Sequence, residues 1–442
     1  MPIPKTGDPT IPSNNRPISL LSVLSKITEK VACTQLTAYL EKSALLNSSQ
    51  YAYRPGHSTE DAVLATVERL IANTDRGHIS SVTTIDLSKA FDCVDHDVLL
   101  SKLSWYGVTD IDWFRSYLSG RKQIVRGGQL TLPLSCGVPQ GSILCPILFI
   151  LFTNDLNNFI THGHLLTYAD DTTHIDCTSP DGPGLLELKA RLQQTISELQ
   201  SWFGANSLKM NERKTHFMLV GTKQKLMKAA DFHLEISGAV VHASKNIKIL
   251  GVTVDSELSW NDHVSSVVRK CNCILISLYR CRHYFTPHVL KIIIQTYVFP
   301  YIRYCMCVWG GTTKNNMTKL QKIINFSARI VCNVKKYDHI TSALISLEWP
   351  RIEVMAAHGD LLKLYRTLKE EGAPHDIKTM FVPRAAVSER QTRATDMGRL
   401  HLPNPRLAAT RRAFSYRAAA AWNRLPPTTC GAPSVKAFKA ML

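Results

Sequence analysis

Residues 165–176 read LLTYADDTTHID. Apolar and β-branched residues flank the adjacent acids Asp170 and Asp171, a pattern that predicts two short strands around a tight acidic turn. Asp86 ends another β-branched stretch, SSVTTIDL (80–87). If these strands are sheet neighbours, three mutually repelling carboxylates converge and offer the oxygen ligands that Mg²⁺ prefers. The tripeptide alone leaves open the alternative of an exposed Asp-Asp turn.

The remaining pattern predicts a mixed α+β chain whose second half is mostly helical. A single strand is also expected over 247–255, and residues 372–412, rich in Pro and Arg, are expected to be irregular. Apolar residues at helical spacing predict helices over 24–40, 59–71, 97–106, 146–159, 188–203, 264–278, from Thr286 onward, and over 320–331, 413–424 and 434–442.

The charge of the 442-residue chain is distributed unevenly. The net charge is +17, and residues 257–442, with 28 basic and 11 acidic side chains, carry all of it. A basic half joined to a balanced half favours a polyanion-binding region attached to a second function. Within that half we expect Lys319, Lys322, Arg329, Lys335 and Lys336 to meet nucleic acid, with a merely solvated helix face as the alternative.

Composition also bounds the location. No run of 18 apolar residues is present, and the first fifteen residues lack an apolar signal core, so we expect an intracellular protein of the nucleus or cytoplasm that is neither secreted nor membrane-bound. The twelve cysteines form no disulfide framework. Cys271, Cys273, Cys281 and His283 have the residue types of a zinc site, but they lie in an expected helix, and whether they bind anything stays open.

Seven segments in order resemble the reverse transcriptase family, most closely the polymerases of non-LTR (LINE-type) retrotransposons. The three central segments resemble motifs A, B and C, two upstream segments resemble the fingers blocks, and two downstream segments resemble motifs D and E. They are TTIDLSKAFDCVDHDVLL (83–100), LPLSCGVPQGSILCPILFILFTNDL (132–156), LLTYADDTTH (165–174), RPISLLSVLSKITEK (16–30), SQYAYRPGHSTEDAV (49–63), SLKMNERKTHFMLVG (207–221) and KILGVTVDSELSW (248–260).

The resemblance implies a right-hand polymerase fold, with an antiparallel sheet and helices in fingers and palm, followed by an all-α thumb-like and C-terminal region. We expect partial fingers over 1–80, a palm over 81–256, a helical thumb-like region over 257–345 and a basic, partly irregular region over 346–442. The implied activity is that of an RNA-directed DNA polymerase, a nucleotidyltransferase that extends a DNA 3′ end on an RNA template. The implied partners are RNA template, DNA primer and dNTPs, with an RNA–DNA hybrid along the basic half.

The resemblance assigns the chemistry to a few residues. Asp86, Asp170 and Asp171, with the backbone carbonyl of Leu87, would hold two Mg²⁺ ions for in-line phosphoryl transfer. Lys214 matches a lysine proposed to protonate the departing pyrophosphate.

Other matched positions would bind substrate. Phe91 matches an aromatic residue that excludes the ribose 2′-hydroxyl, and Gln140 and Gly141 would line the nucleotide and template pocket. Arg54 would grip the triphosphate, and Arg16 would do the same or touch the template.

The turn at Leu250 and Gly251 would support the primer. The chain departs from the family in lacking the usual upstream endonuclease and a closing Cys/His motif, so we expect a truncated copy or a fragment. A catalytically inactive remnant that only binds nucleic acid is the alternative.

Overall fold

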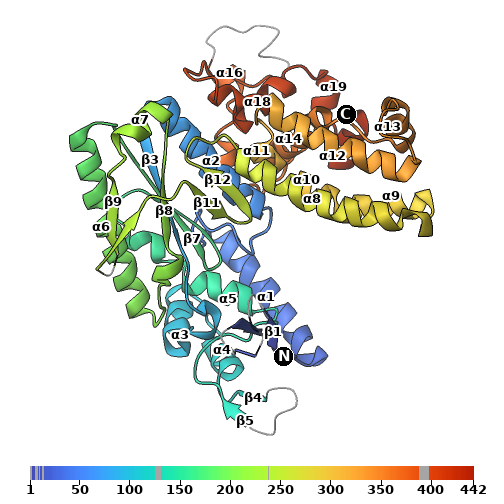
Figure 1. The fold of residues 1–442 in the computed structure, drawn as a ribbon. Helices are drawn as coiled ribbons and strands as arrows, with labels where there is room; N and C mark the ends of the chain where they lie inside the picture. The colour runs from blue at the N-terminus through green and yellow to red at the C-terminus, as the bar shows by residue number, and fades with distance from the viewer. Residues whose placement is uncertain are drawn as a thin grey trace.

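The computed structural model describes residues 2–4, 8, 10–11, 14–124, 131–236, 238–387 and 398–442. Figure 1 shows an antiparallel sheet with flanking helices on one side of the molecule and a helical half on the other. The chain is therefore a mixed helix-and-sheet protein, as the sequence pattern predicts.

The central sheet has four strands in the order β6-β7-β3-β8, and every pairing is antiparallel. Strand β3 lies between two neighbours and is buried along almost its whole length, which suits its β-branched composition. The strands are β3 (Ile79–Ile85), β6 (His164–Tyr168), β7 (Asp171–Thr178) and β8 (His216–Val220).

Helices cover both faces of this sheet because side chains alternate along each strand. Val82 of β3 packs in one hydrophobic cluster with apolar residues of α2 (Thr59–Asp75). Ile79 and Ile85, on the opposite face, pack in a second cluster with those of α6 (Gly182–Ala205). The sheet is thus buried on both sides, and only the ends of its strands are available for a site.

The N-terminal half contains further helices and hairpins. Asp95 caps α3 through its carboxylate, which accepts the N–H groups of Asp97 and Val98. The other elements are α1 (Val23–Lys42), α3 (His96–Trp105), α4 (Ile111–Leu118), α5 (Cys145–Phe152), α7 (Lys223–Lys228), β1 (Pro2–Pro4) with β2 (Asn15–Pro17), β4 (Lys122–Ile124) with β5 (Thr131–Pro133), and β9 (His233–Ile236) with β10 (Ala239–His242).

Two expectations about these elements are wrong in detail. The single strand expected over 247–255 is a hairpin of β11 (Asn246–Ile249) and β12 (Val252–Asp255), because Leu250 and Gly251 take positive φ values and reverse the chain. The helix expected over 146–159 ends at Phe152 and is followed by a separate 3₁₀ turn, Leu156–Phe159.

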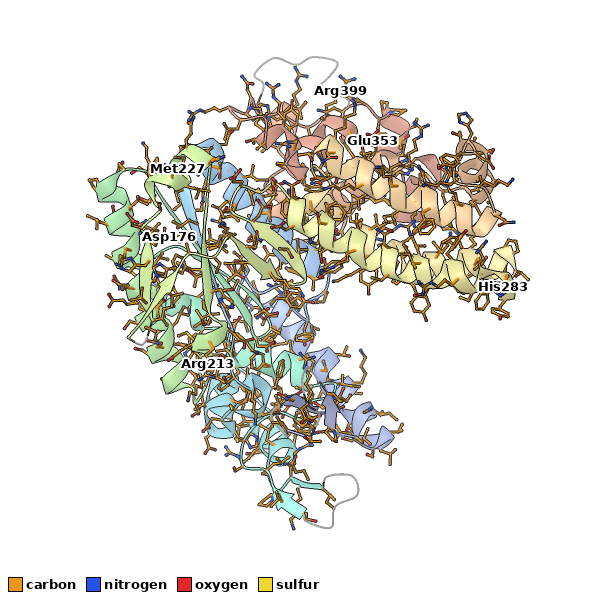
Figure 2. The ribbon with its side chains drawn as sticks, in the orientation of Figure 1. Asp176, Arg213, Met227, His283, Glu353 and Arg399 are labelled. Carbon is orange, nitrogen blue, oxygen red and sulfur yellow. The ribbon has the colours of Figure 1, made fainter. Side chains whose placement is uncertain are left out.

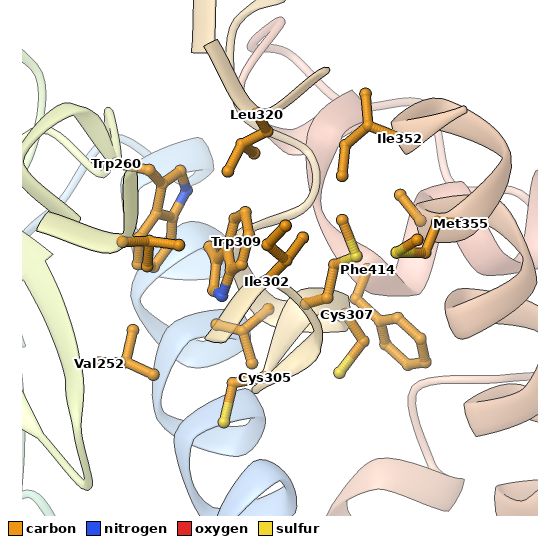
Figure 3. Packing of buried hydrophobic residues seen from close by; sticks show 14 of the residues in the cluster. Val252, Trp260, Ile302, Cys305, Cys307, Trp309, Leu320, Ile352, Met355 and Phe414 are labelled. Atoms are coloured by element: carbon orange, nitrogen blue, oxygen red, sulfur yellow. The ribbon is translucent and has the colours of Figure 1, made fainter. Parts of the chain in front are cut away.

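The second half is helical and packs around one core. Figure 3 shows Trp309 beside Trp260 and Ile302, with Ile352 and Phe414 in the same core. Its main helices are α8 (Asn261–Cys281), α9 (Pro287–Tyr297), α10 (Phe299–Arg303), α11 (Met306–Trp309), α12 (Lys314–Cys332), α13 (Thr341–Leu347), α14 (Ile352–Lys369), α18 (Phe414–Trp422) and α20 (Val435–Met441). This core continues across residue 345, and the division expected there stays a prediction.

The region expected to be irregular contains short helices, α15 (His375–Lys378) and α16 (Arg384–Val387), and residues 388–397 of it lie outside the described residues. A further one-turn helix, α19 (Pro427–Cys430), precedes α20. Within the described ranges, no helix has the length and apolar content needed to cross a membrane.

Candidate active site

Strand register brings Asp86 beside Asp171. β3 and β7 pair with Ile85 opposite Thr172, and each acid lies one residue beyond that pair. Asp170 occupies the two-residue turn between β6 and β7, next to Ala169, whose φ is +55°. The strand end and the acidic turn are therefore sheet neighbours, which is the condition under which the sequence predicts that these acids converge.

The electrostatics of Asp171 reflect this crowding. Desolvation by the surrounding protein, together with the negative charges of Asp170 and Asp86, raises the pKa of Asp171 to about 6. Solvent still reaches the side chain, so the desolvation is partial. The positive charges of Arg16 and Lys214 act in the opposite direction and lower this pKa. The site thus carries excess negative charge that nearby basic groups offset only in part.

Asp86 has direct partners on the segment before β8. Its Oδ2 atom lies 3.2 Å from the Nζ atom of Lys214 and accepts a hydrogen bond from the Asn211 side-chain amide, also at 3.2 Å. The Asn211 backbone N–H donates to the Asp86 carbonyl at 2.8 Å. Lys214 lies in a 3₁₀ turn, Glu212–Lys214, and its side chain is largely exposed. The quoted 207–221 segment holds both residues, but only Lys214 was singled out from sequence.

A cavity of about 370 Å³ joins these groups to the 250–251 turn. Its lining includes Asp86, Asp171, Lys214, Leu250 and Gly251. The first and the last of these residues, Asp86 and Gly251, are 165 positions apart along the chain. The structure thus places two of the three expected acids, the lysine and the turn around one cavity, and Asp170 lies in the adjoining turn outside its lining.

Phe91 and Gln140 lie in two segments that contact each other, the segment after β3 and the loop before α5. The Phe91 ring stacks on Phe149 of α5, with 4.1 Å between ring centroids. The Gln140 amide donates to the Asp92 carboxylate at 2.8 Å. This bond ties the segment that follows β3 to the loop before α5, so the two expected substrate-binding segments lie together.

The loop at Gly141 is held by the N-terminal segment. Gly141 has a φ of +110°, and a Cβ there would lie 2.8 Å from the Ser19 carbonyl oxygen, so only glycine fits. Glu29, which is 1% exposed, accepts the Ile143 N–H at 2.7 Å and the Ser25 hydroxyl at 3.1 Å. Sequence reasoning missed Glu29, because nothing in its local pattern distinguishes it from a solvated helical glutamate.

The two arginines differ in their surroundings. Arg16, on exposed β2, acts electrostatically on Asp171 and on Tyr53. Arg54 is mostly buried, forms a bidentate ion pair with Glu41 at 2.9 Å, and donates to the Asn47 carbonyl. The guanidinium of Arg54 therefore stabilises the loop between α1 and α2, and its expected contact with a triphosphate stays a prediction.

The carboxylates suit divalent cations in their chemistry. Within the residues that the structure describes, no three His, Cys, Asp or Glu side chains are placed to hold a metal ion as they stand. Asp86 is turned toward Lys214, whose ammonium partly neutralises it. Desolvation is the main cause of the raised pKa of Asp171, and repulsion by Asp170 and Asp86 adds to it. A cation between Asp86 and Asp171 would offset this repulsion, and carboxylate oxygens are ligands that Mg²⁺ prefers, so the donor set fits Mg²⁺. The backbone of Leu87 forms an isolated antiparallel β-bridge with Met210, and the role of the Leu87 carbonyl as a metal ligand stays a prediction.

The cysteine and histidine candidates lie elsewhere. Cys271 is buried, with its thiol 3.9 Å from the Val298 carbonyl, whereas Cys273 is exposed on another face of α8. Figure 2 shows His283 at the end of α8 that is remote from the sheet. The sheet can be located in the figure by the label of Asp176. These residues do not join the carboxylate cavity.

The antiparallel sheet thus carries carboxylates at one end of its central strands, and paired carboxylates of this kind are suited to metal-assisted phosphoryl transfer. The chain belongs to the reverse transcriptase family: residues 3–254 match the family described as reverse transcriptase (RNA-dependent DNA polymerase). Members of this family generally use divalent metal ions.

Named relatives agree with this assignment. The chain is 29% identical over 361 residues to a probable RNA-directed DNA polymerase from transposon BS of Drosophila melanogaster, covering 76% of this chain and 38% of that protein. It is 24% identical to the RNA-directed DNA polymerase from mobile element jockey of the same organism, covering 60% and 29%. The resemblance to LINE-type polymerases is confirmed. The chain spans less than two fifths of the length of these relatives.

Among solved structures, telomerase from Candida albicans in complex with a TWJ fragment of telomeric RNA aligns with a TM-score of 0.44 and 14% identity, covering 80% of this chain and 55% of that one.

Proposed function

We propose that the chain is an RNA-directed DNA polymerase of a LINE-type retrotransposon, which extends a DNA 3′ end on an RNA template by phosphoryl transfer from dNTPs. The observation that carries the proposal is the meeting of Asp86 and Asp171 in one cavity with the 250–251 turn. In this proposal, residues 1–80 form partial fingers, 81–256 the palm, 257–345 the thumb, and 346–442 a basic region that follows it.

Asp86, Asp170 and Asp171 would hold two Mg²⁺ ions, with the carbonyl of Leu87 as a further ligand. When bound, the ions would lower the pKa of the primer 3′-hydroxyl and neutralise the triphosphate. Lys214, already 3.2 Å from Asp86, is close enough to the cavity to donate a proton to the leaving pyrophosphate.

The substrate would lie between the carboxylates and the stacked rings of Phe91 and Phe149. The Phe91 ring stacks on the Phe149 ring, which fixes its position. A ring fixed in this way would exclude a ribose 2′-hydroxyl by steric contact. Gln140 and Gly141 would approach the nucleotide and template from the loop before α5. Arg16, which acts on Asp171 electrostatically, is the better placed of the two arginines to meet a phosphate or the template.

The RNA–DNA hybrid would lie along α8 and α9, which form the edge of the helical half nearest α1 in Figure 1. At the end of α8, the guanidinium of Arg282 lies over the ring of Tyr279, an exposed residue of that helix, so a cation and an aromatic ring are combined there. Both kinds of group bind nucleic acid through phosphates and bases. Of the cations expected on α12, Arg329 is engaged with the carbonyls of Lys335 and Asp338.

Primer extension tests the proposal. We expect Mg²⁺-dependent incorporation of dTTP on poly(rA)/oligo(dT), abolished by Asp170→Asn and by chelation of the metal. Binding of the hybrid without any extension by the parent chain would instead identify an inactive remnant. Extension that survives Asp170→Asn would refute the assignment of the carboxylates.

A further inference from the structure

Tyr304, in the segment that follows α10, contacts the turn that lines the carboxylate cavity. Its hydroxyl donates to the Leu250 carbonyl at 2.6 Å. Its ring lies against Gly251, where an added Cβ would be 3.4 Å from the nearest ring atom. A residue from the helical half therefore touches both residues of the 250–251 turn.

This turn needs external support because of its backbone. Leu250 has a φ of +44° and Gly251 a φ of +87°, so both residues are left-handed, as in a two-residue type I′ hairpin turn. Such turns favour Asn or Asp before Gly, and a leucine at positive φ is strained. A hydrogen bond to the Leu250 carbonyl fixes the peptide group at the point of strain.

Tyr304 is itself fixed by the core of the helical half. Its carbonyl accepts the indole N–H of Trp309 at 2.9 Å, and its N–H donates to the Pro300 carbonyl at 2.9 Å. Trp309 is fully buried beside Trp260 (Figure 3). A continuous chain of contacts thus runs from a buried tryptophan through Tyr304 to the turn.

We propose that Tyr304 is a positioning residue that holds the 250–251 turn against the primer strand and thereby sets the primer end relative to Asp86 and Asp171. This inference rests on the proposed function, which assigns the turn to the primer. The site would then include Tyr304, which lies in the helical half and takes no direct part in the chemical step. The hydroxyl acts through the Leu250 peptide, so its loss affects primer placement and not the binding of nucleotide.

The test compares Tyr304→Phe with Tyr301→Phe in the full chain. Both changes remove one hydroxyl from a partly exposed tyrosine, at 41% and 42% exposure, but only Tyr304 bonds to Leu250. For Tyr304→Phe we expect the KM for poly(rA)/oligo(dT) to rise about three- to tenfold, with the KM for dTTP within twofold of the parent. Tyr301→Phe should leave both constants unchanged. Because the Tyr304 hydroxyl also interacts with Thr59, Thr59→Val serves as a second control that should not change the primer KM.

A primer with 2-aminopurine at its 3′ end reports placement without catalysis. Tyr304→Phe should change its fluorescence in the bound hybrid, and Gly251→Ala, which strains the same turn because Gly251 has a φ of +87°, should change it as well. Equal constants and equal fluorescence for Tyr304→Phe and the parent would overturn the inference, as would equal effects of Tyr304→Phe and Tyr301→Phe. Failure of the proposed function has a different signature, since the parent chain would then bind the labelled hybrid but not extend it.

Discussion

Asp61 of α2 forms a buried ion pair with Lys363 of α14, 302 positions further along the chain. Two further acids on α2 also reach the C-terminal region: Glu68 accepts the Ser415 N–H, and Asp75 accepts the Leu407 N–H and the Thr410 hydroxyl. The helix that covers one face of the sheet is thus braced by the last hundred residues.

Lys363→Met tests this brace. The change leaves the Asp61 carboxylate, whose side chain is 2% exposed, without its cation, and we expect the free energy of unfolding to fall by about 3–5 kcal/mol. Urea denaturation measures the loss. The matched control is Arg115→Met, which breaks the exposed pair with Asp112 and should cost less than about 1 kcal/mol. Similar costs for the two variants would show that the brace adds nothing.

Asp171→Asn separates activity from stability. Because its carboxylate is held near other negative charges, we expect neutralisation to abolish primer extension while the melting temperature in EDTA stays equal or rises. Asp176→Asn, on the same strand, removes an ion pair with Arg191 outside the cavity, so it should lower the melting temperature and keep the activity. A large loss of stability in Asp171→Asn would contradict the repulsion described for the site.

Phe91→Ala tests sugar discrimination. Removing the ring that stacks on Phe149 opens space beside the sugar, so we expect the ratio of kcat/KM for dTTP over UTP to fall at least tenfold. Single-nucleotide incorporation with each substrate measures the ratio. Phe159→Ala, which removes an exposed ring from the 3₁₀ turn Leu156–Phe159, is the control and should leave the ratio unchanged.

Glu29→Ala tests the support of the loop before α5. The substitution leaves the half-buried Ile143 N–H without its acceptor, and we expect a loss of about 1–3 kcal/mol in unfolding free energy together with a higher KM for dTTP. Denaturation and steady-state kinetics measure the two effects. A stability loss with an unchanged KM for dTTP would limit Glu29 to folding.

The buried Asp360 predicts a pH dependence. Burial raises the pKa of Asp360 to about 6, and the Arg417 guanidinium, 2.9 Å away, opposes the shift. The folded state therefore keeps this proton up to about pH 6, whereas the unfolded chain loses it near pH 4, so the contribution of Asp360 to stability falls as pH rises between these values. Relative to Asp360→Asn, we expect the parent chain to lose about 3 kcal/mol from pH 4 to pH 7. If the unfolding free energies of the parent chain and Asp360→Asn changed equally from pH 4 to pH 7, the raised pKa of Asp360 would be contradicted.

Lys363 and Arg417 show that not every basic residue of the second half is available to bind a polyanion. The net excess of +17 lies in residues 257–442 and predicts a polyanion-binding half. Both cations form ion pairs with buried carboxylates, so part of the basic composition serves the fold. Composition counts charges but cannot tell which of them pair within the chain.

The family, the order of the motifs, and the strands and turn that carry Asp86, Asp170 and Asp171 could all be predicted from the amino-acid sequence. Such features depend on periodicity and turn chemistry over a few residues, which the local sequence contains. Only the tertiary structure decided that Asp86 pairs with Lys214, that Arg54 is engaged by Glu41, and that Tyr304 supports Leu250. These contacts depend on which faces meet after folding, and segments many positions apart leave no local pattern that specifies it.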